Sequence, residues 1–303
     1  MKKRKILKIN TIKELGLQLD LPVDFLLKKA DCIESSYKKF KDKDKKGKIR
    51  EYYVVDSELK FIHKKINLLL DSINFPTTMQ GGIKGRSIYG NALIHSNKKY
   101  VANFDIKNFF PSVNYNVVYK TFLSQKCTPD VARLLTRLTT VDSLLPQGFS
   151  TSPKISVLVL MEINNRLNNI FKRYSLNYTF WIDDLTVSGN NRIDKFTNLI
   201  YKIFKQSGFL LNSKKTNFSE IHRKQICTGL IINCKPNADK KLRKEVRKEL
   251  YLCRKFGVKN FVKEHKENIS VEKYLNTLRG KINFLCSLNS KYNSYKIYFE
   301  KLI

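Results

Sequence analysis

The sequence predicts a folded protein of the α+β class, and three observations support this. Apolar residues make up 42% of the 303 residues and aromatic residues 12%, which is typical of a chain with a substantial core. Short segments rich in β-branched and aromatic residues are interspersed with segments whose apolar residues recur every three or four positions. No internal repeat or long linker interrupts the chain, so its subdomains should pack closely.

In the first part of the chain, the spacing of apolar residues predicts helices, and enrichment in β-branched or aromatic residues predicts a hairpin and strands. In order, these are short helices to about Phe40, a hairpin tip at Gly47, a strand at 49–55, a helix at 58–73, a glycine-punctuated loop running into a helix at 81–95, and a strand at 98–105 with a turn at Pro111.

The second part of the sequence has the patterns of further helices and strands. In order, these elements are a loop and one helix at 145–167, strands flanking an acidic pair at 178–189, a helix at 196–208, a short strand at 225–233, and two basic amphipathic helices. Ser152 is the expected N-cap of the helix in the first of these segments, with Pro153 at its first position. Gly208 is expected to end the helix that precedes it.

The charge of the chain indicates a polyanionic partner. Lys and Arg total 58 against 26 Asp and Glu, which gives a formal net charge of +32. Such an excess repels itself in a compact protein, and phosphate contacts that release counterions are the simplest explanation. The competing interpretation, a basic membrane-surface protein, lacks a long amphipathic segment with aromatic anchors.

Several other classes are disfavoured. The longest apolar run, residues 157–161, is far shorter than the ~20 residues of a membrane-spanning helix. The basic N-terminus lacks the apolar stretch of a signal peptide. The six Cys form no CxxC pair and the four His no HExxH, so we expect a cytoplasmic protein with reduced thiols and no zinc site.

The adjacent acids Asp183 and Asp184 are the first candidates for chemistry. Neighbouring carboxylates repel, so they either decorate a solvated turn or hold a cation. Asp105, at the end of another predicted strand, would complete the arrangement that two-metal nucleotidyl transfer needs, with two Mg²⁺ ions ~4 Å apart held by a few hard oxygen ligands. Taken alone, an acidic pair favours the solvated turn.

The order of the surrounding segments favours the metal. FDIKNFFPSV, LPQGFSTSP, WIDDLTVSG, GFLLNSKKT and CTGLIIN occur in that order. The series resembles motifs A to E of reverse transcriptases, and retron reverse transcriptases most closely, from about Lys48 to the C-terminus. NALIH also resembles the retron NAxxH box, and CTG resembles the VTG box but differs at its first position.

The resemblance implies a right-hand polymerase with an antiparallel palm sheet, helical fingers and a helical thumb. We assign N-terminal helices and fingers to residues 1–97, the palm with an inserted fingers segment to 98–224, and the thumb to 225–303. No room for an RNase H domain follows the thumb, so removal of the template would need a host RNase H.

The same resemblance assigns the catalytic groups. Asp105, Asp183 and Asp184 would be ligands of two Mg²⁺ ions, with the carbonyl of Ile106 as a further oxygen. Lys215 matches the motif D lysine, a candidate proton donor to the pyrophosphate leaving group, and its neighbour Lys214 is a close rival.

The nucleotide-binding groups follow in the same way. Phe110 matches the ring that blocks a ribose 2′-OH, which requires the chain to turn near Asn108; the alternative is a plain core residue. Gln147 should lie against the incoming dNTP, unless it is an ordinary loop residue. Lys48 and Arg50 resemble the residues that grip the triphosphate, although Lys48 could equally belong to a solvated charge run.

Asn91, His95, Thr228 and Gly229 would contact a cognate structured RNA, with local capping and turn geometry as the alternative. Arg279 would meet the nucleic-acid backbone in the thumb or be solvated. Reverse transcriptases usually have an aromatic and a small residue before the acidic pair, where this chain has Trp181 and Ile182. The bulk of Ile182 puts processivity, fidelity or substrate choice in question more than catalysis.

Retron resemblance implies synthesis of DNA on a non-coding RNA, primed from a 2′-OH of that RNA, which gives a branched RNA–DNA hybrid (msDNA) used in anti-phage defence with a separately encoded effector. Three alternatives stay open. They are a reverse transcriptase of another defence group with untemplated or protein-primed synthesis, a group II intron-type enzyme, and a catalytically silent RNA-binding protein of the same fold.

Overall fold

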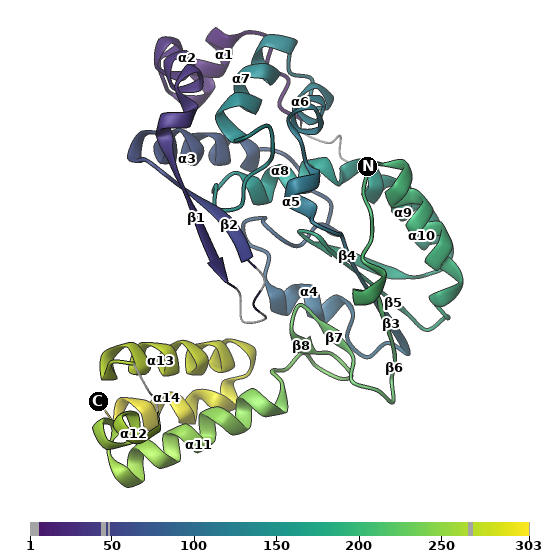
Figure 1. The fold of residues 1–303 in the computed structure, drawn as a ribbon. Coiled ribbons are helices and arrows are strands. Elements are labelled where there is room, and N and C mark those ends of the chain that lie inside the picture. The colour runs from purple at the N-terminus through teal and green to yellow at the C-terminus, as the bar shows by residue number, and fades with distance from the viewer. Residues whose placement is uncertain (1–5, 44–46, 48, 266–268, 303) are drawn as a thin grey trace. The chain divides into compact units, whose positions relative to one another are not determined.

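The computed structural model describes residues 6–43, 47, 49–265 and 269–302, and it shows an α+β protein (Figure 1). The chain divides into two compact units. Unit 1 comprises Met1–Ser87 and Ala102–Phe218, and unit 2 comprises Ile88–Val101 and Ser219–Ile303. Among the described helices, none is both long enough and apolar enough to cross a membrane.

The N-terminal part of unit 1 contains the expected helices and hairpin. Its elements are α1 (Ile12–Leu19), α2 (Val23–Asp31), η1 (Ile33–Ser36), β1 (Tyr37–Lys43), β2 (Ile49–Val55) and α3 (Ser57–Asp71). Strands β1 and β2 pair antiparallel from Tyr37↔Val55 to Lys43↔Ile49. The predicted helical region therefore ends a few residues earlier than expected, because residues 37–40 belong to the hairpin.

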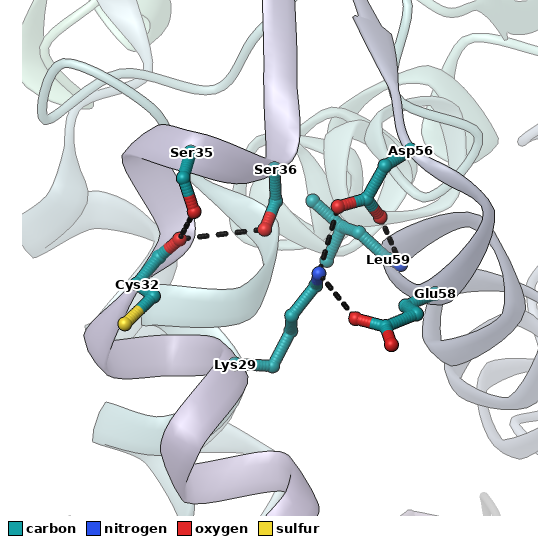
Figure 2. Close-up of polar contacts among 7 residues, drawn as sticks. All are labelled: Lys29, Cys32, Ser35, Ser36, Asp56, Glu58 and Leu59. Carbon is teal, nitrogen blue, oxygen red and sulfur yellow. Dashed lines mark hydrogen bonds and ion pairs between the residues drawn. The ribbon is translucent and has the colours of Figure 1, made fainter.

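Polar contacts hold the two ends of this hairpin together (Figure 2). The ammonium of Lys29 on α2 lies 2.7 Å from carboxylate oxygens of both Asp56 and Glu58. Asp56 also caps α3 by accepting from the Leu59 N–H at 2.7 Å, and its own N–H donates to the Ser36 carbonyl. Burial acts to raise the pKa of Asp56, but the bonds from Lys29 and Leu59 outweigh it and lower the pKa. The hairpin is thus anchored at its base.

The rest of unit 1 surrounds the central sheet. Its elements are β3 (Tyr100–Asp105), α5 (Phe109–Ser112), α6 (Tyr115–Ser124), α7 (Pro129–Thr139), α8 (Ser152–Val159), α9 (Met161–Arg173), β4 (Asn177–Trp181), β5 (Asp184–Gly189), η2 (Asp194–Phe196), α10 (Thr197–Gln206), η3 (Ser213–Lys215) and β6 (Asn217–Glu220). The first two residues of β3 and the last two of β6 fall within the bounds of unit 2. The sheet has the order β4-β5-β3-β6, so the hairpin β4–β5 lies beside the strand that ends at Asp105. Buried rings fill the core, among them Phe104, Phe180 and Phe204.

The helix expected across 152–167 differs from the prediction in two ways. It is divided at Leu160 into α8 and α9, and the Ser156 hydroxyl donates to the Ser152 carbonyl at 2.7 Å, a bond that bends helices. The predicted N-cap is also wrong by one position: Thr151 precedes the helix, and the Ser152 hydroxyl donates to the Pro146 carbonyl instead.

Unit 2 is mainly helical. Its elements are α4 (Ile88–Ile94), β7 (Ile226–Cys227), β8 (Leu230–Ile231), α11 (Lys240–Phe256), α12 (Val258–His265), α13 (Val271–Leu288), η4 (Ser290–Tyr292) and α14 (Asn293–Glu300). The two predicted basic helices are α11 and α13, and an apolar core that includes Val246, Leu278 and Leu285 joins them to the shorter helices. The single strand expected at 225–233 is instead a tight hairpin, β7–β8.

Candidate active site

The acidic pair lies at a two-residue hairpin turn beside the end of β3. Strands β4 and β5 pair antiparallel up to Trp181↔Asp184, which leaves Ile182 and Asp183 as the turn. The Ile106 N–H donates to the Asp183 carbonyl at 3.1 Å, so the segment after Asp105 is hydrogen-bonded to the turn. The Asp at the end of β3 and the Asp pair of the hairpin are therefore neighbours, as expected.

Ile182 has a backbone conformation that β-branched residues rarely adopt. Its φ is 58°, in the left-handed region. The preceding strand is held by a second segment: Phe180 donates to the Thr78 carbonyl at 2.7 Å and accepts from the N–H groups of Gln80 and Gly81 at 2.7 and 3.2 Å. These bonds fix the strand immediately before the turn, which is the condition under which a strained residue persists.

Gly81 is packed against the turn itself. A Cβ at this position would lie 2.5 Å from the Ile182 nitrogen, so only glycine fits here. The guanidinium of Arg86 holds the preceding loop by donating to the carbonyls of Pro76 at 2.5 Å, Phe75 at 2.9 Å and Met79. Burial lowers the pKa of Arg86. The glycine-punctuated stretch is thus a support for the acidic turn, a role that the sequence did not reveal.

The carboxylates of the site oppose one another electrostatically. Burial raises the pKa of Asp183, and the charge of Asp105 adds to the effect. Burial, followed by the charges of Asp183 and Asp105, raises the pKa of Asp184 to about 6. The Asp184 side chain nevertheless keeps accessible surface, as a metal ligand must. Mutually repelling carboxylates with hard oxygen donors fit a divalent cation.

Lys215 supplies a positive charge to this cluster. Its ammonium lies 2.6 Å from the Asp105 carboxylate. Within the described residues, no group of three or more His, Cys, Asp or Glu side chains is gathered closely enough to enclose a metal ion. The three acids therefore share one region without forming a closed ligand cage, and Asp105 is engaged by Lys215.

A cavity of about 440 Å³ opens beside these groups in unit 1. Its lining includes Arg50, Asp105, Phe110, Gln147, Asp183 and Lys215. The expected turn near Asn108 is present: its φ of 49° and ψ of 48° direct the chain into α5, which brings Phe110 to the cavity wall. Asp184 and Lys214 are not among the lining residues, and Lys48 lies outside the described residues.

The hairpin β1–β2 and the LPQG loop form one wall of this cavity. The Tyr53 N–H donates to the Gln147 carbonyl at 2.9 Å. Gly148 has a φ of 107°, and a Cβ there would collide with the Tyr53 backbone. Tyr53 and Asn212, whose N–H donates to the Asp105 carbonyl at 2.8 Å, are lining residues that sequence reasoning missed, because each is identified only by its neighbours in space.

The geometry agrees with comparison to known proteins. The profile of the family described as reverse transcriptase (RNA-dependent DNA polymerase) matches residues 38–285. The chain belongs to the reverse transcriptase family. Members of this family generally use divalent metal ions, which agrees with the donor set of the acidic turn.

Two retron reverse transcriptases are similar to the chain along most of its length. Retron Se72 reverse transcriptase of Salmonella heidelberg (strain 579083-10) is 30% identical over 247 residues, covering 78% of this chain and 64% of the relative. Retron Ec86 reverse transcriptase of Escherichia coli is 29% identical over 267 residues, covering 86% and 79%. The chain thus spans slightly less than two thirds of the Se72 protein.

A solved structure supports the fold. Telomerase from Candida albicans, in complex with the TWJ fragment of telomeric RNA, superimposes with a TM-score of 0.50 at 11% identity. The match covers 88% of this chain and 63% of the telomerase chain. At this identity, the likeness concerns the reverse transcriptase fold alone.

The boxes expected to contact RNA pack against each other within unit 2. Asn91 and His95 have 0% exposure, so in this structure neither side chain has surface with which to touch RNA. The Asn91 amide donates to the Cys227 sulfur at 3.3 Å, and burial lowers the pKa of His95 to about 3. Asn91 and Cys227 thus join the two boxes in the interior of unit 2, and direct RNA contact by Asn91 and His95 stays a prediction.

Thr228 and Gly229 form the turn between β7 and β8. Their φ values are 46° and 79°, the signature of a type I′ hairpin turn, in which a β-branched residue is unusual. The Thr228 hydroxyl donates to the Ile88 carbonyl at 3.4 Å, which joins the turn to α4. These two residues have the turn geometry that was the alternative to RNA binding, and a role in RNA binding remains a prediction.

Arg279 lies on the exposed side of α13. Its guanidinium stacks over the Phe299 ring at 5.5 Å and donates to the Asn276 amide oxygen at 3.5 Å. An exposed guanidinium held by an aromatic ring is available for a phosphate. The structure is thus compatible with the expected backbone contact.

Proposed function

We propose that this protein is an RNA-directed DNA polymerase that copies a structured RNA using dNTPs. The observation that supports it best is the cavity of unit 1, whose wall combines acidic groups, a cationic group from the hairpin, an aromatic ring and a loop glutamine. These groups come from Asp105, Asp183, Arg50, Phe110 and Gln147, which are far apart in the sequence. A single nucleotide-binding site explains why these chemically different side chains line one cavity better than chance does.

The acids would hold the metal. Two Mg²⁺ ions bound by Asp105, Asp183 and Asp184, with the Ile106 carbonyl as a further ligand, would activate the primer hydroxyl and neutralise the triphosphate. Both ions need ionised carboxylates, and Asp184 is mostly ionised at neutral pH even though its pKa is raised to about 6. The bonds to Phe180 hold the turn so that the ligands keep their positions.

The remaining cavity residues would bind and select the nucleotide. Arg50 lines the same cavity as Asp183, where burial raises the pKa of that acid and the charge of Arg50 partly opposes the rise, and it would contact the triphosphate. The Phe110 ring would lie where a ribose 2′-OH projects, and Gln147 would lie against the sugar or base. Lys215 would leave Asp105 when that acid becomes a ligand, and would donate a proton to the pyrophosphate leaving group.

We further propose that the RNA is a cognate non-coding RNA of the retron type. Similarity to the Se72 and Ec86 retron enzymes supports this. Synthesis would start from a 2′-OH of the RNA and give msDNA, which would act in anti-phage defence with a separately encoded effector. A host RNase H would remove the template.

The decisive experiment is purification of the protein from its host and sequencing of the bound nucleic acid before and after RNase and debranching treatment. DNA joined by a 2′–5′ link to one structured RNA is the expected result. Unbranched DNA would instead indicate protein-primed or untemplated synthesis by an enzyme of another defence group. Heterogeneous RNA without DNA would indicate a binding protein that has lost catalysis.

Catalysis is tested by the substitution Asp183→Asn, with Asp184→Asn as a second variant. Each removes one negative ligand while keeping the size of the side chain. We expect DNA synthesis to fall on the order of 10³-fold, as when other groups that stabilise developing charge are removed. RNA binding should persist, because these acids repel phosphate. Normal synthesis by either variant would contradict the two-metal assignment.

A further inference from the structure

A tight turn in unit 1 joins three of the segments that form the wall of the catalytic cavity. Its two central residues, Asp142 and Ser143, have φ values of 50° and 60°, as a two-residue hairpin turn requires. Val141 and Leu144, on either side, exchange backbone hydrogen bonds at 2.9 and 2.8 Å. These two flanking residues line the cavity, whereas Asp142 does not. The side chain of Asp142 can therefore affect the cavity only through its neighbours.

The first segment joined by the turn is the one that carries Phe110. The Ser143 carbonyl accepts from the Tyr115 N–H at 2.8 Å, and the Leu145 N–H donates to the Val113 carbonyl, also at 2.8 Å. The Val113 N–H in turn donates to the Phe110 carbonyl at 3.1 Å. The backbone of the turn is thus hydrogen-bonded to the end of α5, the short helix that brings Phe110 to the cavity wall.

The second segment is the hairpin β1–β2, which the side chain of Asp142 contacts. The Tyr53 hydroxyl donates to the Asp142 carboxylate at 3.1 Å. Burial, followed by this bond, raises the pKa of Tyr53, so its hydroxyl is protonated and can donate at neutral pH. The Lys39 ammonium lies 3.9 Å from the same carboxylate, but both side chains are about half exposed and solvent screens the pair. The hydrogen bond is therefore the contact that fixes the geometry.

The third segment is the LPQG loop, which Tyr53 contacts through its backbone. The Tyr53 N–H donates to the Gln147 carbonyl at 2.9 Å, and a Cβ at Gly148 would collide with the Tyr53 backbone. The Tyr53 ring packs edge-on against Phe149, with ring centroids 6.4 Å apart. Tyr53 is thus held at one end by the loop and at the other end by Asp142.

We propose that Asp142 is a positioning residue for nucleotide binding, which acts through Tyr53 without touching the nucleotide. The bond between them holds the hairpin against the LPQG loop, so that Arg50 and Gln147 keep their places in the wall of one cavity. A nucleotide binds more tightly to groups that are already in place, because less order is lost on binding. The inference rests on the proposed function in one respect, because a dNTP is taken as the ligand of the cavity.

The test is single-turnover incorporation of dTTP on poly(rA) primed with oligo(dT), which measures the apparent dissociation constant and the maximal rate separately. Asp142→Gly removes the acceptor and still suits the left-handed φ of this position. The dissociation constant should rise about three- to tenfold, because a hydrogen bond to a charged group is lost at a partly exposed site. The maximal rate should change less than about twofold, because other contacts hold the acidic turn.

Two further variants assign the effect to the hydrogen bond. Asp142→Asn keeps an acceptor for the Tyr53 hydroxyl and tolerates the same φ, so its affinity for dTTP should be within about twofold of wild type. Tyr53→Phe removes the donor and keeps the ring, so it should weaken binding by about the same factor as Asp142→Gly. The double variant should be no weaker than either single variant, because both substitutions remove one bond. Additive losses would overturn the proposal.

The matched control is Asp20→Gly. Asp20 also has a positive φ, of 53°, and its exposed carboxylate is ion-paired, with Lys65 at 2.8 Å. It lies at the end of α1, a helix with no residue in the cavity lining, so both kinetic constants should be nearly unchanged. An equal rise in the dissociation constant for Asp20→Gly and Asp142→Gly would overturn the proposal. A lower maximal rate of Asp142→Gly with unchanged affinity would do the same.

Hydrogen exchange measured by mass spectrometry tests the anchor of the hairpin without DNA synthesis. In Asp142→Gly the amides of β2 should exchange faster than in wild type, whereas those of α10 should not, which also shows that unit 1 is folded. Unchanged exchange in β2 would overturn the proposal. If wild-type protein incorporates no dTTP, the polymerase assignment fails, and the exchange of β2 still decides whether Asp142 holds the hairpin.

Discussion

The ammonium of Lys215 lies 2.6 Å from the carboxylate of Asp105, where the proposed proton donor engages a proposed metal ligand. Both groups line the same cavity. The Lys215 side chain is 60% exposed and that of Asp105 17%, so solvent screens the pair and it contributes little to stability. The pair is therefore easily exchanged when Asp105 takes another partner.

Replacement of this lysine should separate metal binding from catalysis. In Lys215→Gln the competing cation is gone, so the Mg²⁺ concentration for half-maximal activity should fall about two- to fivefold. The rate of nucleotide addition should fall about 10²-fold, because a general acid is lost. Steady-state rates over a Mg²⁺ titration measure both effects. Lys214→Gln is the matched control, and a larger loss in this variant would assign the proton donor to Lys214.

Neutralisation of Asp184 should stabilise the metal-free protein at neutral pH. The pKa of this acid is raised from 3.8 to about 6, so the folded state keeps the proton at pH values at which the unfolded chain has already released it. This group therefore reduces stability as pH rises from about 4 to about 6, and the full penalty persists above that range.

The midpoint of thermal unfolding measures this effect in EDTA. Asp184→Asn should unfold at a higher temperature than wild type at pH 7.5, and the difference should shrink towards zero below pH 4. Added Mg²⁺ should stabilise wild type but not the variant. A difference that does not depend on pH would show that charge repulsion is not its cause.

A methyl group at Gly81 should disrupt the acidic turn. The added Cβ of Gly81→Ala would lie 2.5 Å from the Ile182 nitrogen, so the turn must move. We expect unfolding to become easier by about 1–3 kcal/mol, typical of overpacking, and DNA synthesis to fall at least about tenfold. Urea unfolding and primer extension measure the two effects. Gly280→Ala, inside helix α13 where a Cβ meets nothing within 4 Å, is the control: it should leave DNA synthesis nearly unchanged and make unfolding harder by about 0.5–1 kcal/mol, because alanine favours the helix.

Removal of the Phe110 ring should relax the choice of sugar. Phe110→Ala opens the cavity wall where a 2′-OH would project, so incorporation of ribonucleotides should rise on the order of tenfold to a hundredfold relative to deoxynucleotides. Single-nucleotide incorporation with matched dNTP and rNTP measures the ratio. Phe110→Tyr keeps the ring and should retain discrimination. An unchanged ratio in Phe110→Ala would assign the ring to the core.

The unusual Trp181–Ile182 pair also has a clearer physical setting. The family habit of a small residue before the acids made Ile182 unexpected, and the structure places it at a φ of 58° with Gly81 against its nitrogen. A Cβ at position 81 would approach both the Ile182 nitrogen, at 2.5 Å, and its Cγ1, at 2.9 Å, so the glycine leaves space for the turn and for this side chain.

Local patterns in the sequence were sufficient for much of the fold. Residues 49–55 form a strand and residues 57–71 a helix because pairing period and apolar spacing are local properties. Gly208, with a φ of 83°, follows the end of α10 for a similarly local reason. Two predictions were wrong because they depended on contacts that a local pattern does not specify. The Ser152 hydroxyl donates to the Pro146 carbonyl and does not cap the helix, and the segment 225–233 pairs with itself as a hairpin.

The sequence by itself determined the order of motifs, the acidic pair at a hairpin turn and the family that these imply. Only the tertiary structure decided that Gly81 supports the turn, that Lys215 engages Asp105, and that Asn91 and His95 are buried. The physical reason is that burial, ion pairing and close backbone contact depend on which residues are neighbours in space. The separation of two residues in the sequence does not reveal whether they are such neighbours.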